Sequence, residues 1–184
     1  MALVESTMVP LGTEAHDFKL DGTDGNTYSL TSFTHSKVIV IVFMCNHCPY
    51  VKAVLQRLIN LQNEFINKGV QFIGINSNDA INYPDDSLEN MKIMAKEKKF
   101  SFPYLFDPSQ STAKKYNAVC TPDLYVYGKN RKLIYRGRVD DNWEHQEKVT
   151  KKDLKLALEN ILTGKLIASE QIPSIGCSIK WKTP

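Results

Sequence analysis

Residues 37–49, KVIVIVFMCNHCP, join an unbroken apolar run to two cysteines separated by two residues. The run is rich in β-branched side chains and does not alternate with polar ones, which is typical of a strand covered on both faces of a parallel sheet. After it, residues 51–65 place apolar side chains at helical spacing, and residues 70–76 (VQFIGIN) form a second apolar run. A strand, a helix and a strand in this order predict a βαβ unit with a right-handed crossover. The cysteines fall at its first strand-to-helix junction.

Outward from this unit, the pattern predicts further helices and a hairpin. Asp86 and Glu89 have the spacing of a capping box at the start of a helix. Thr150 and Asp153 have the same spacing before a last amphipathic helix. Two strand-like runs around a turn at 128–130 predict an antiparallel hairpin. The order of elements is that of an α/β fold with a mixed sheet.

The composition is that of an ordinary globular chain. With 184 residues, 42% of them hydrophobic and 23% charged, the chain is long enough to bury a core and short enough for one domain. Its 4 cysteines are too few for a scaffold built on disulfides. We therefore predict a single domain over residues 1–184 in which the cysteines have another purpose.

Charge and hydropathy limit the expected location and partners. The longest apolar run, residues 38–45, is far shorter than the roughly 18 residues that span a membrane. Residues 1–10 contain neither a basic residue nor the apolar stretch of a secretory signal, so we expect a cytoplasmic protein that does not bind membranes. The net charge is +3, and the basic residues at 131–138 are accompanied by no nucleic-acid motif. We interpret them as a solvated face and expect no nucleic-acid partner.

The segment Cys45-Asn46-His47-Cys48 carries the strongest chemical signal. A thiol in the first turn of a helix lies beside unpaired N–H groups and the positive end of the helix dipole, and both favour the thiolate that attacks disulfides. A CxxC directly after a buried strand of a βαβ unit therefore favours redox chemistry over a structural pair. We assign the two intervening residues, Asn46 and His47, to tuning the thiolate. A partly protonated His47 should stabilise the thiolate and make the couple more oxidising.

The other two cysteines leave alternatives open. A zinc site would need a second pair at similar spacing, whereas Cys120 and Cys177 each stand alone, so we predict neither a metal nor a cofactor. Cys120 precedes Thr121-Pro122, an X–Pro dipeptide in which a cis bond can occur. Cys177 lies in the tail at 165–184, which has no clear period. Both are either small apolar fillers or accessory redox thiols, with the tail folded back so that Cys177 pairs with Cys120 or relays electrons.

Together these features resemble the redoxin group of thioredoxin-fold proteins. That group includes alkyl-hydroperoxide-reductase-like, thiol-specific-antioxidant-like and thiol:disulfide-interchange proteins. The resemblance covers about residues 9–163 and rests on AHDF at 15–18 with DG at 21–22, on the CNHCP segment, and on Thr121-Pro122 before the hairpin. The stretches FMCNHCPYVK and PSIGCSIKW are similar to an uncharacterised bacterial subgroup.

The resemblance implies a fold, a reaction and partners. The fold is thioredoxin-like, a central mixed sheet flanked by helices, here with an N-terminal extension and a short C-terminal tail. The implied activity is that of a thiol:disulfide oxidoreductase with an antioxidant role, in which Cys45 attacks and Cys48 resolves. Thr121-Pro122 would be a cis-proline element at which the Thr121 backbone pairs with the substrate chain. The implied partners are protein thiols or disulfides, small-molecule disulfides and a reductase.

Two positions depart from the thioredoxin pattern. Met44 stands where thioredoxins have a Trp before the first Cys, and Ile39 stands where they have a buried Asp that accepts a proton. These two departures weaken what the resemblance implies about general disulfide reduction. The histidine between the cysteines is instead similar to the motif of periplasmic dithiol oxidases.

Two alternative functions remain. In a peroxiredoxin-like thiol peroxidase, Cys48 would be the peroxidatic thiol, with Cys45, Ile41 and the region of Thr121 in place of the Thr, Pro and Arg that hold peroxide in that family. In a thioredoxin-fold copper chaperone, the two cysteines and a distant histidine such as His145 would bind the metal, and soft thiolates suit Cu(I). The first alternative is an enzyme and the second is a binding protein.

Overall fold

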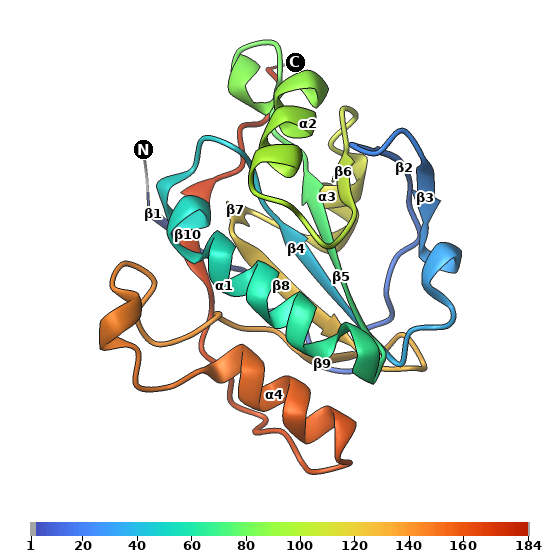
Figure 1. Ribbon diagram of the computed structural model, residues 1–184, viewed down its shortest axis with the longest axis vertical. Coiled ribbons are helices and arrows are strands. Elements are labelled where there is room, and N and C mark those ends of the chain that lie inside the picture. The colour runs from blue at the N-terminus through green and yellow to red at the C-terminus, as the bar shows by residue number, and fades with distance from the viewer. Residues whose placement is uncertain (1–2, 184) are drawn as a thin grey trace.

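Within residues 3–183, which the computed structural model describes, seven strands form a central sheet between two layers of helices (Figure 1). The order across this sheet is β3-β2-β6-β5-β4-β8-β9. The strands are β2 (Lys19–Gly22), β3 (Thr27–Ser29), β4 (Val38–Phe43), β5 (Val70–Asn76), β6 (Tyr104–Phe106), β8 (Asp123–Tyr127) and β9 (Leu133–Tyr135). Strands β4, β5 and β6 run parallel, and their neighbours on either side pair antiparallel. The predicted mixed sheet and thioredoxin-like fold are therefore confirmed.

The predicted βαβ unit is present as β4, α1 and β5. The α-helices are α1 (Pro49–Phe65), α2 (Leu88–Glu97), α3 (Ser111–Tyr116) and α4 (Asp153–Leu162), and the 3-10 helices are η1 (Leu30–Phe33), η2 (Ile66–Lys68), η3 (Pro84–Asp86) and η4 (Gln146–Lys148). β4 pairs with β5 along its full length. Between η2 and β5 the chain turns at Gly69, whose φ of 90° is a left-handed conformation that glycine adopts without strain.

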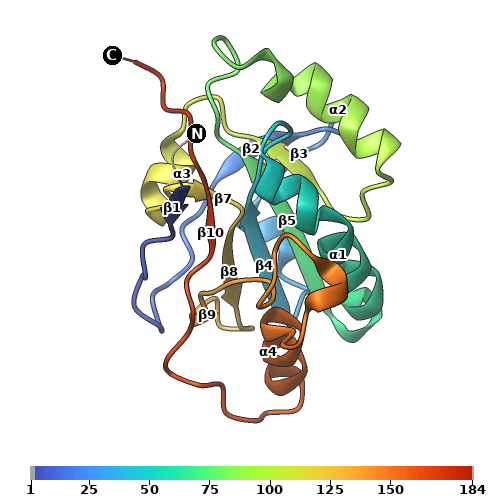
Figure 2. The same cartoon turned by 90° about the vertical axis from the view of Figure 1, so that its left-hand side faces the viewer.

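Strand β4 is buried on both faces, as its unbroken apolar run predicts. Successive side chains of a strand point to opposite faces, and here they enter two hydrophobic cores. Val40 lies in the core that α1, α2 and α4 cover, whereas Ile41 lies in the core that α3 and η1 cover. Figure 2 shows α1 and α4 on one side of the sheet and α3 on the other. Because β4 is packed on both faces, its carboxyl end is held in a fixed position, and the cysteines follow directly after it.

The two ends of the chain meet in a second sheet. In the part of the chain that the structure describes, this sheet has three strands in the order β1-β10-β7. They are β1 (Leu3–Glu5), β7 (Cys120–Thr121) and β10 (Ile175–Ser178). The tail, whose sequence shows no clear period, thus contributes a strand that lies between the N-terminal segment and the Thr121-Pro122 segment (Figure 2).

Both predicted capping boxes are wrong. Ser87, not Asp86, is the N-cap of α2, and its hydroxyl accepts a backbone N–H of the first turn at 3.4 Å. The N-cap position of α4 belongs to Lys152, while the Thr150 side chain bonds the carboxylate of Asp141. In each case the side chain that the local pattern predicts as a cap is hydrogen-bonded to another side chain instead, Asp86 to His47 and Thr150 to Asp141.

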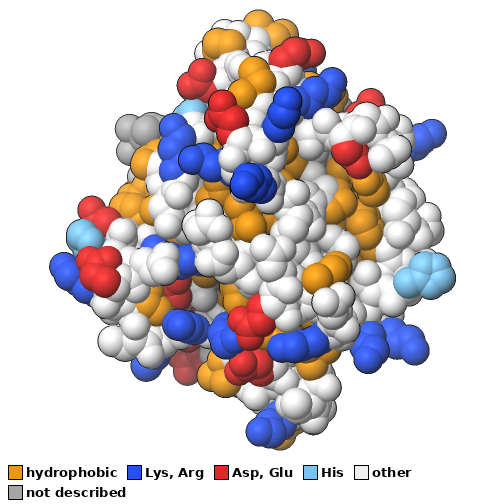
Figure 3. All heavy atoms as spheres, in the orientation of Figure 1, with side chains coloured by type: hydrophobic (Ala, Val, Ile, Leu, Met, Phe, Trp, Pro, Cys, Tyr) orange, Lys and Arg blue, Asp and Glu red, His pale blue; other side chains and the backbone are white. Residues whose placement is uncertain are grey.

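The hairpin is present as β8 and β9, but it contains a charged residue that the sequence placed on the surface. Arg136 is fully buried, and its guanidinium pairs with the carboxylate of Asp123 and lies 3.8 Å from the ring of Tyr125. On the face that Figure 3 shows, basic and acidic side chains are interspersed. None of the helices over residues 3–183 has the length and apolar character that crossing a bilayer requires.

Candidate active site

The CNHC segment lies where the chain leaves β4 and enters α1. Helix α1 begins at Pro49 and has Cys48 as its N-cap, so Cys48, rather than Cys45, lies at the positive end of the helix. Cys45 lies in the irregular segment before it. The thiol expected at the start of the helix is therefore that of Cys48. A proline disfavours helical geometry in the residue before it, so the helix starts only after the second thiol.

Both thiols face the segment that contains Thr121. The Sγ of Cys45 lies 3.5 Å from the hydroxyl of Thr121, and the Cys48 thiol donates to the carbonyl oxygen of Thr121 at 3.1 Å. The peptide bond between Thr121 and Pro122 is cis. Both cysteine side chains are buried, with exposed fractions of 1% and 0%. The structure thus brings together the four residues on which the redox hypothesis depends.

The two thiols are hydrogen-bonded to each other, and this divides their acidity. The hydrogen bond from Cys45 holds the pKa of Cys48 well below its usual range. Burial raises this pKa, whereas hydrogen bonds with Cys177 and the Val51 backbone lower it further. The same bond to Cys48, burial and the nearby Asp86 carboxylate raise the pKa of Cys45. The first proton that the pair loses therefore leaves its charge mainly on Cys48.

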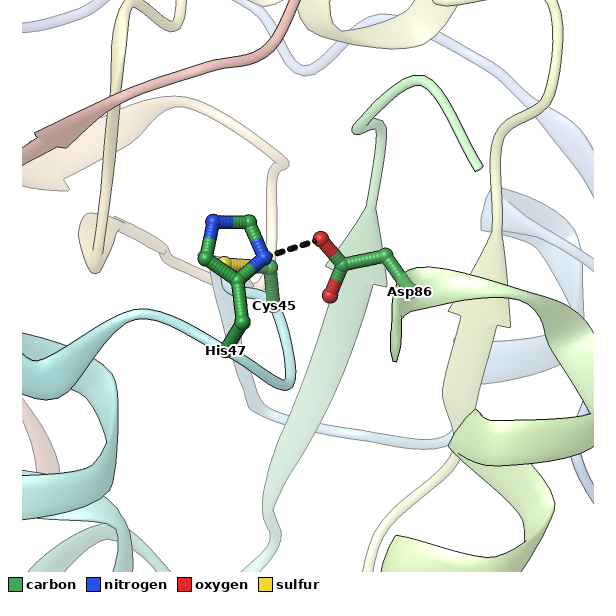
Figure 4. Close-up of side chains that lie close together, drawn as sticks. All are labelled: Cys45, His47 and Asp86. Atoms are coloured by element: carbon green, nitrogen blue, oxygen red, sulfur yellow. Dashed lines mark hydrogen bonds and ion pairs between the residues drawn. The ribbon is translucent and has the colours of Figure 1, made fainter. Parts of the chain in front are cut away.

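His47 lies beside the sulfur of Cys45 and reaches a buried carboxylate (Figure 4). Its Nδ1 lies 2.6 Å from Oδ2 of Asp86, and its ring stacks on Tyr83 with centroids 5.5 Å apart. The bond to Asp86 raises the pKa of His47 although burial opposes it. Burial raises the pKa of Asp86, but the hydrogen bonds from His47, Asn78 and the Asn46 backbone outweigh it and hold that pKa below its usual value. The pair is therefore an imidazolium and a carboxylate at mildly acidic pH.

Asn46 anchors the segment on both sides. Its backbone N–H donates to Oδ1 of Asp86 at 2.7 Å, and its side-chain NH2 donates to the carbonyl of Asp85 at 2.8 Å. The hydroxyl of Tyr104, on β6, donates to the Asn46 side-chain oxygen at 3.0 Å. The contacts of Asn46 are those of a residue that positions the loop, whereas His47 brings a charge close to the thiols.

Asp86 is the functional residue that the sequence reasoning missed. The local pattern predicts a helix cap at Asp86, yet its side chain is completely buried and also accepts from Asn76 at 3.3 Å and Asn78 at 2.8 Å. The available signal was the polar run at 76–79, directly after an apolar strand. Carboxyl ends of parallel strands meet at one edge of a sheet, so this run had to approach the CNHC segment.

The two remaining cysteines differ in their surroundings. Cys120 is buried beside Asp123, and burial and this charge raise the pKa of Cys120 far above its usual value. Cys177, on β10, is opposite Thr121 in the strand pairing and is hydrogen-bonded to the thiol of Cys48. Burial and this bond raise the pKa of Cys177 to about 12. All four cysteines are in the thiol form in the structure. The edge that the resemblance assigns to the substrate chain is thus occupied by β10.

The described residues include one group that could hold a metal ion. The ligand atoms of Cys45, His47 and Asp86 lie within 4.8 Å of one another. Here Nδ1 and the carboxylate are bonded to each other, and both carboxylate oxygens accept further hydrogen bonds, so the atoms are engaged in an internal network. His145 is outside this group, and its ring contacts the exposed carboxylates of Glu144 and Glu147. The ligand set expected for a copper chaperone is not assembled.

A buried CxxC at the first strand-to-helix junction of a mixed sheet, facing a cis-proline segment, defines a thioredoxin-like protein. The chain belongs to the Redoxin family, whose pattern matches residues 10–154. No curated protein matches the sequence.

Two solved structures resemble nearly the whole chain. An uncharacterized conserved protein from Geobacillus kaustophilus is 47% identical, with a TM-score of 0.95 over 100% of this chain and 98% of that one. A hypothetical protein from Sinorhizobium meliloti 1021 is 39% identical, with a TM-score of 0.93 over 98% and 99% of the two chains. A thiol:disulfide interchange protein from a Bacteroides species shares the fold at 19% identity, with a TM-score of 0.66 over 85% and 92%. The last comparison supports the fold alone.

Proposed function

We propose that this protein is a thiol:disulfide oxidoreductase that cycles Cys45 and Cys48 between a dithiol and a disulfide. The observation that carries the proposal is the pair of hydrogen-bonded thiols at the start of α1, in contact with Thr121 before the cis peptide bond. Membership of the Redoxin family supports the same chemistry.

We assign Cys45 as the attacking thiol and Cys48 as the resolving one, as the family resemblance implies. Contacts with Thr121, Cys177 and the Val51 N–H hold the Cys48 sulfur in place beside Cys45. After the pair has lost one proton to solvent, the remaining proton passes from Cys45 along the shared hydrogen bond to Cys48, whose thiol donates a hydrogen bond to the Thr121 carbonyl. The Cys45 thiolate attacks one sulfur of the substrate disulfide and releases the other as a thiolate. Cys48 then gives up its proton and attacks the Cys45 sulfur, which releases the second substrate thiol and leaves the Cys45–Cys48 disulfide.

The substrate approaches from the side of Pro122. A surface hollow of about 180 Å³ extends to this residue, and the side chains of Trp143 and Ile175 contribute to its wall. Its lining is mostly apolar, which suits an extended segment of a protein or a small aromatic disulfide. We therefore propose protein disulfides and small-molecule disulfides as substrates.

The test is to trap the mixed disulfide with an aromatic disulfide such as 5,5′-dithiobis(2-nitrobenzoate). We expect Cys48→Ser to retain the aromatic thiolate on Cys45, because the resolving thiol is gone, and Cys45→Ser to lose catalysed exchange. Cys120→Ala is the matched control, because Cys120 is also buried but takes no part in the reaction, and it should exchange like the parent. Catalysed exchange that persists in Cys45→Ser would overturn the assignment.

His47 gives a second test of the same function. Removal of its imidazolium in His47→Ala leaves the Asp86 carboxylate close to Cys45 without its cation, and this carboxylate raises the pKa of Cys45. The reduced form should be less stable, so we expect the couple to become more reducing. Equilibration with glutathione buffers measures the potential, and an unchanged value would contradict a tuning role.

The acidity of Cys48 favours thiol peroxidase as a second candidate. In that reaction the Cys48 thiolate at the N-cap attacks a peroxide oxygen, an alcohol or water leaves, and the resulting sulfenic acid condenses with Cys45 to give a disulfide and water. The discriminating variant is again Cys45→Ser. Stoichiometric hydrogen peroxide consumption by this variant would favour the peroxidase, whereas its loss favours the oxidoreductase.

A further inference from the structure

The C-terminal strand is held in a fixed register against the active site. β10 pairs antiparallel with β7, so that Cys177 is opposite Thr121 and Ser178 is opposite Cys120. Beyond the strand, the N–H of Ile179 donates to the carbonyl of Val119 at 2.9 Å. Figure 2 shows β10 between β1 and β7, and Cys177 is paired with Leu3 of β1 and with Thr121 of β7. The position of Cys177 is therefore set by backbone hydrogen bonds on both sides.

The close approach of β10 depends on a glycine. A Cβ at Gly176 would lie 2.0 Å from the carbonyl oxygen of Thr121. Because the atoms in the way belong to the backbone, any larger side chain at this position would require the two strands to move apart. Glycine at this position therefore lets the two backbones approach closely. The neighbouring Cys177 consequently reaches the same residue that both active-site thiols contact.

Three thiols share this one neighbour. Thr121 contacts Cys45 through its hydroxyl and Cys48 through its carbonyl, and it is paired with Cys177 through the backbone. Cys48 and Cys177 are hydrogen-bonded to each other, and all three side chains belong to one buried cluster. Cys120 lies outside that cluster, although it is only one residue from Thr121.

We propose that Cys177 is a third redox thiol, which exchanges with the Cys45–Cys48 disulfide to form a Cys48–Cys177 disulfide. The inference rests on the proposed function, since that reaction supplies the first disulfide. In the exchange, the Cys177 thiolate attacks Sγ of Cys48, the Cys45–Cys48 bond breaks, and Cys45 leaves as a thiolate that takes up the proton lost by Cys177. One disulfide is exchanged for another, so no further oxidant or reductant is consumed.

The charges at the site favour this exchange once the first disulfide has formed. In the reduced protein, the hydrogen bond and the charge of Cys48 add to burial in raising the pKa of Cys177, while Lys180 lowers it. A Cys45–Cys48 disulfide removes the contributions of Cys48, and that of Lys180 remains. The pKa of Cys177 is therefore lower once the first disulfide has formed, while burial continues to raise it. The released Cys45 is again in contact with the Thr121 hydroxyl.

The consequence is a division of roles between Cys45 and the pair of Cys48 and Cys177. Cys45 returns to the thiol form and can react with a second substrate, while the oxidising equivalent is stored between α1 and the C-terminal strand. A reductant then acts on the Cys48–Cys177 bond to restore the starting state.

Disulfide mapping of the full-length protein tests this proposal without any variant. Trypsin separates the cysteines into three peptides, 38–52 with Cys45 and Cys48, 116–129 with Cys120, and 166–180 with Cys177. The reduced protein is treated with one equivalent of diamide, quenched in acid, alkylated with N-ethylmaleimide and digested. We expect two products: an internal disulfide in 38–52, and a link between 38–52 and 166–180 in which Cys48 is bonded and Cys45 is alkylated.

Variants sharpen the result. Cys177→Ala should abolish the linked product and keep the internal disulfide, Cys120→Ala should keep both, and Cys45→Ser should give the linked product alone. An internal disulfide without any link to 166–180 in the parent would overturn the relay while leaving the proposed function intact. A link to 116–129 in its place would also overturn it. Absence of both the internal disulfide and the link between 38–52 and 166–180 would overturn the proposed function together with the relay.

Discussion

Asp86→Asn should destabilise the protein through the network behind the CNHC segment. The Oδ1 atom of Asp86 accepts from the backbone of Asn46 and the side chain of Asn76. The Oδ2 atom accepts from His47 and Asn78. Asparagine replaces one of these oxygens by an NH2 group, which donates hydrogen bonds and cannot accept them. The two groups that donated to that oxygen therefore lose their acceptor. Hydrogen bonds to charged groups contribute roughly 1.5–3 kcal/mol each, so two of them predict a loss of about 3 kcal/mol in the free energy of unfolding.

The loss should depend on pH in a defined direction. The pKa of His47 is raised above 6.5 in the folded state, so its contribution is fully present below that pH and is lost as the pH rises through the folded value. The pKa of Asp86 is lowered below 3.8, so its contribution is present above that pH and is lost as the pH falls through the folded value. The difference between parent and variant should therefore be largest between these two values. It should shrink toward alkaline pH, because neutral His47 can accept a hydrogen bond from the side-chain amide that the substitution introduces.

Urea unfolding in dithiothreitol, at mildly acidic and at alkaline pH, measures both effects. The matched control is Asp85→Asn, which makes the same chemical change at an exposed neighbouring side chain and should stay within about 0.5 kcal/mol of the parent. A loss in Asp86→Asn no larger than that of the control would refute the reasoning. So would a loss that is the same at both pH values, since the bond to His47 would then contribute nothing.

Three further changes test the packing that positions the site. Asp123→Asn leaves the buried guanidinium of Arg136 without its anion and should cost about 3–5 kcal/mol in urea unfolding, and a variant as stable as the parent would show that the pair is dispensable. Leu58→Ala in the fully buried face of α1 should cost about 2–5 kcal/mol, whereas Leu166→Ala, at a side chain that is 96% exposed, should leave the thermal midpoint unchanged. Tyr104→Phe removes the donor to the Asn46 side chain and should cost about 1 kcal/mol, measured against the parent by the same unfolding assay, and no loss would mean that water replaces the hydroxyl.

The centre of the fold could be predicted from sequence because its signals are local and strong. The β-branched run at 38–43 forms a strand in which alternate side chains enter two different cores, so every position had to be apolar. The cysteines then fall at the carboxyl end of that strand by connectivity alone. The pairing of Cys45 and Cys48 with Thr121 followed from the family resemblance, because 73 residues separate Cys48 from Thr121 and no local pattern connects them.

Buried charges were the weakest part of the prediction. Local patterns predict a helix cap at Asp86 and a solvated face at Arg136, and most charged side chains are indeed exposed. Each is buried only because a specific partner lies opposite it, His47 in one case and Asp123 in the other. Such a partner belongs to a different element, so the sequence around a buried charge does not reveal it.

The C-terminal strand shows the same limit and also what the sequence could have revealed. Pairing between β10 and β7 joins segments more than fifty residues apart, and a short strand at such an edge has no period to detect. The signal in the sequence is Gly176, because an isolated glycine in a strand is typical of a close approach of two backbones.

The close approach of β10 to Thr121 has a chemical consequence. The backbone edge at Thr121 is already paired, so a substrate chain that pairs there must displace β10. Displacement would carry Cys177 away from Cys48, and binding of an extended protein substrate would therefore be coupled to the separation of the third thiol from the other two.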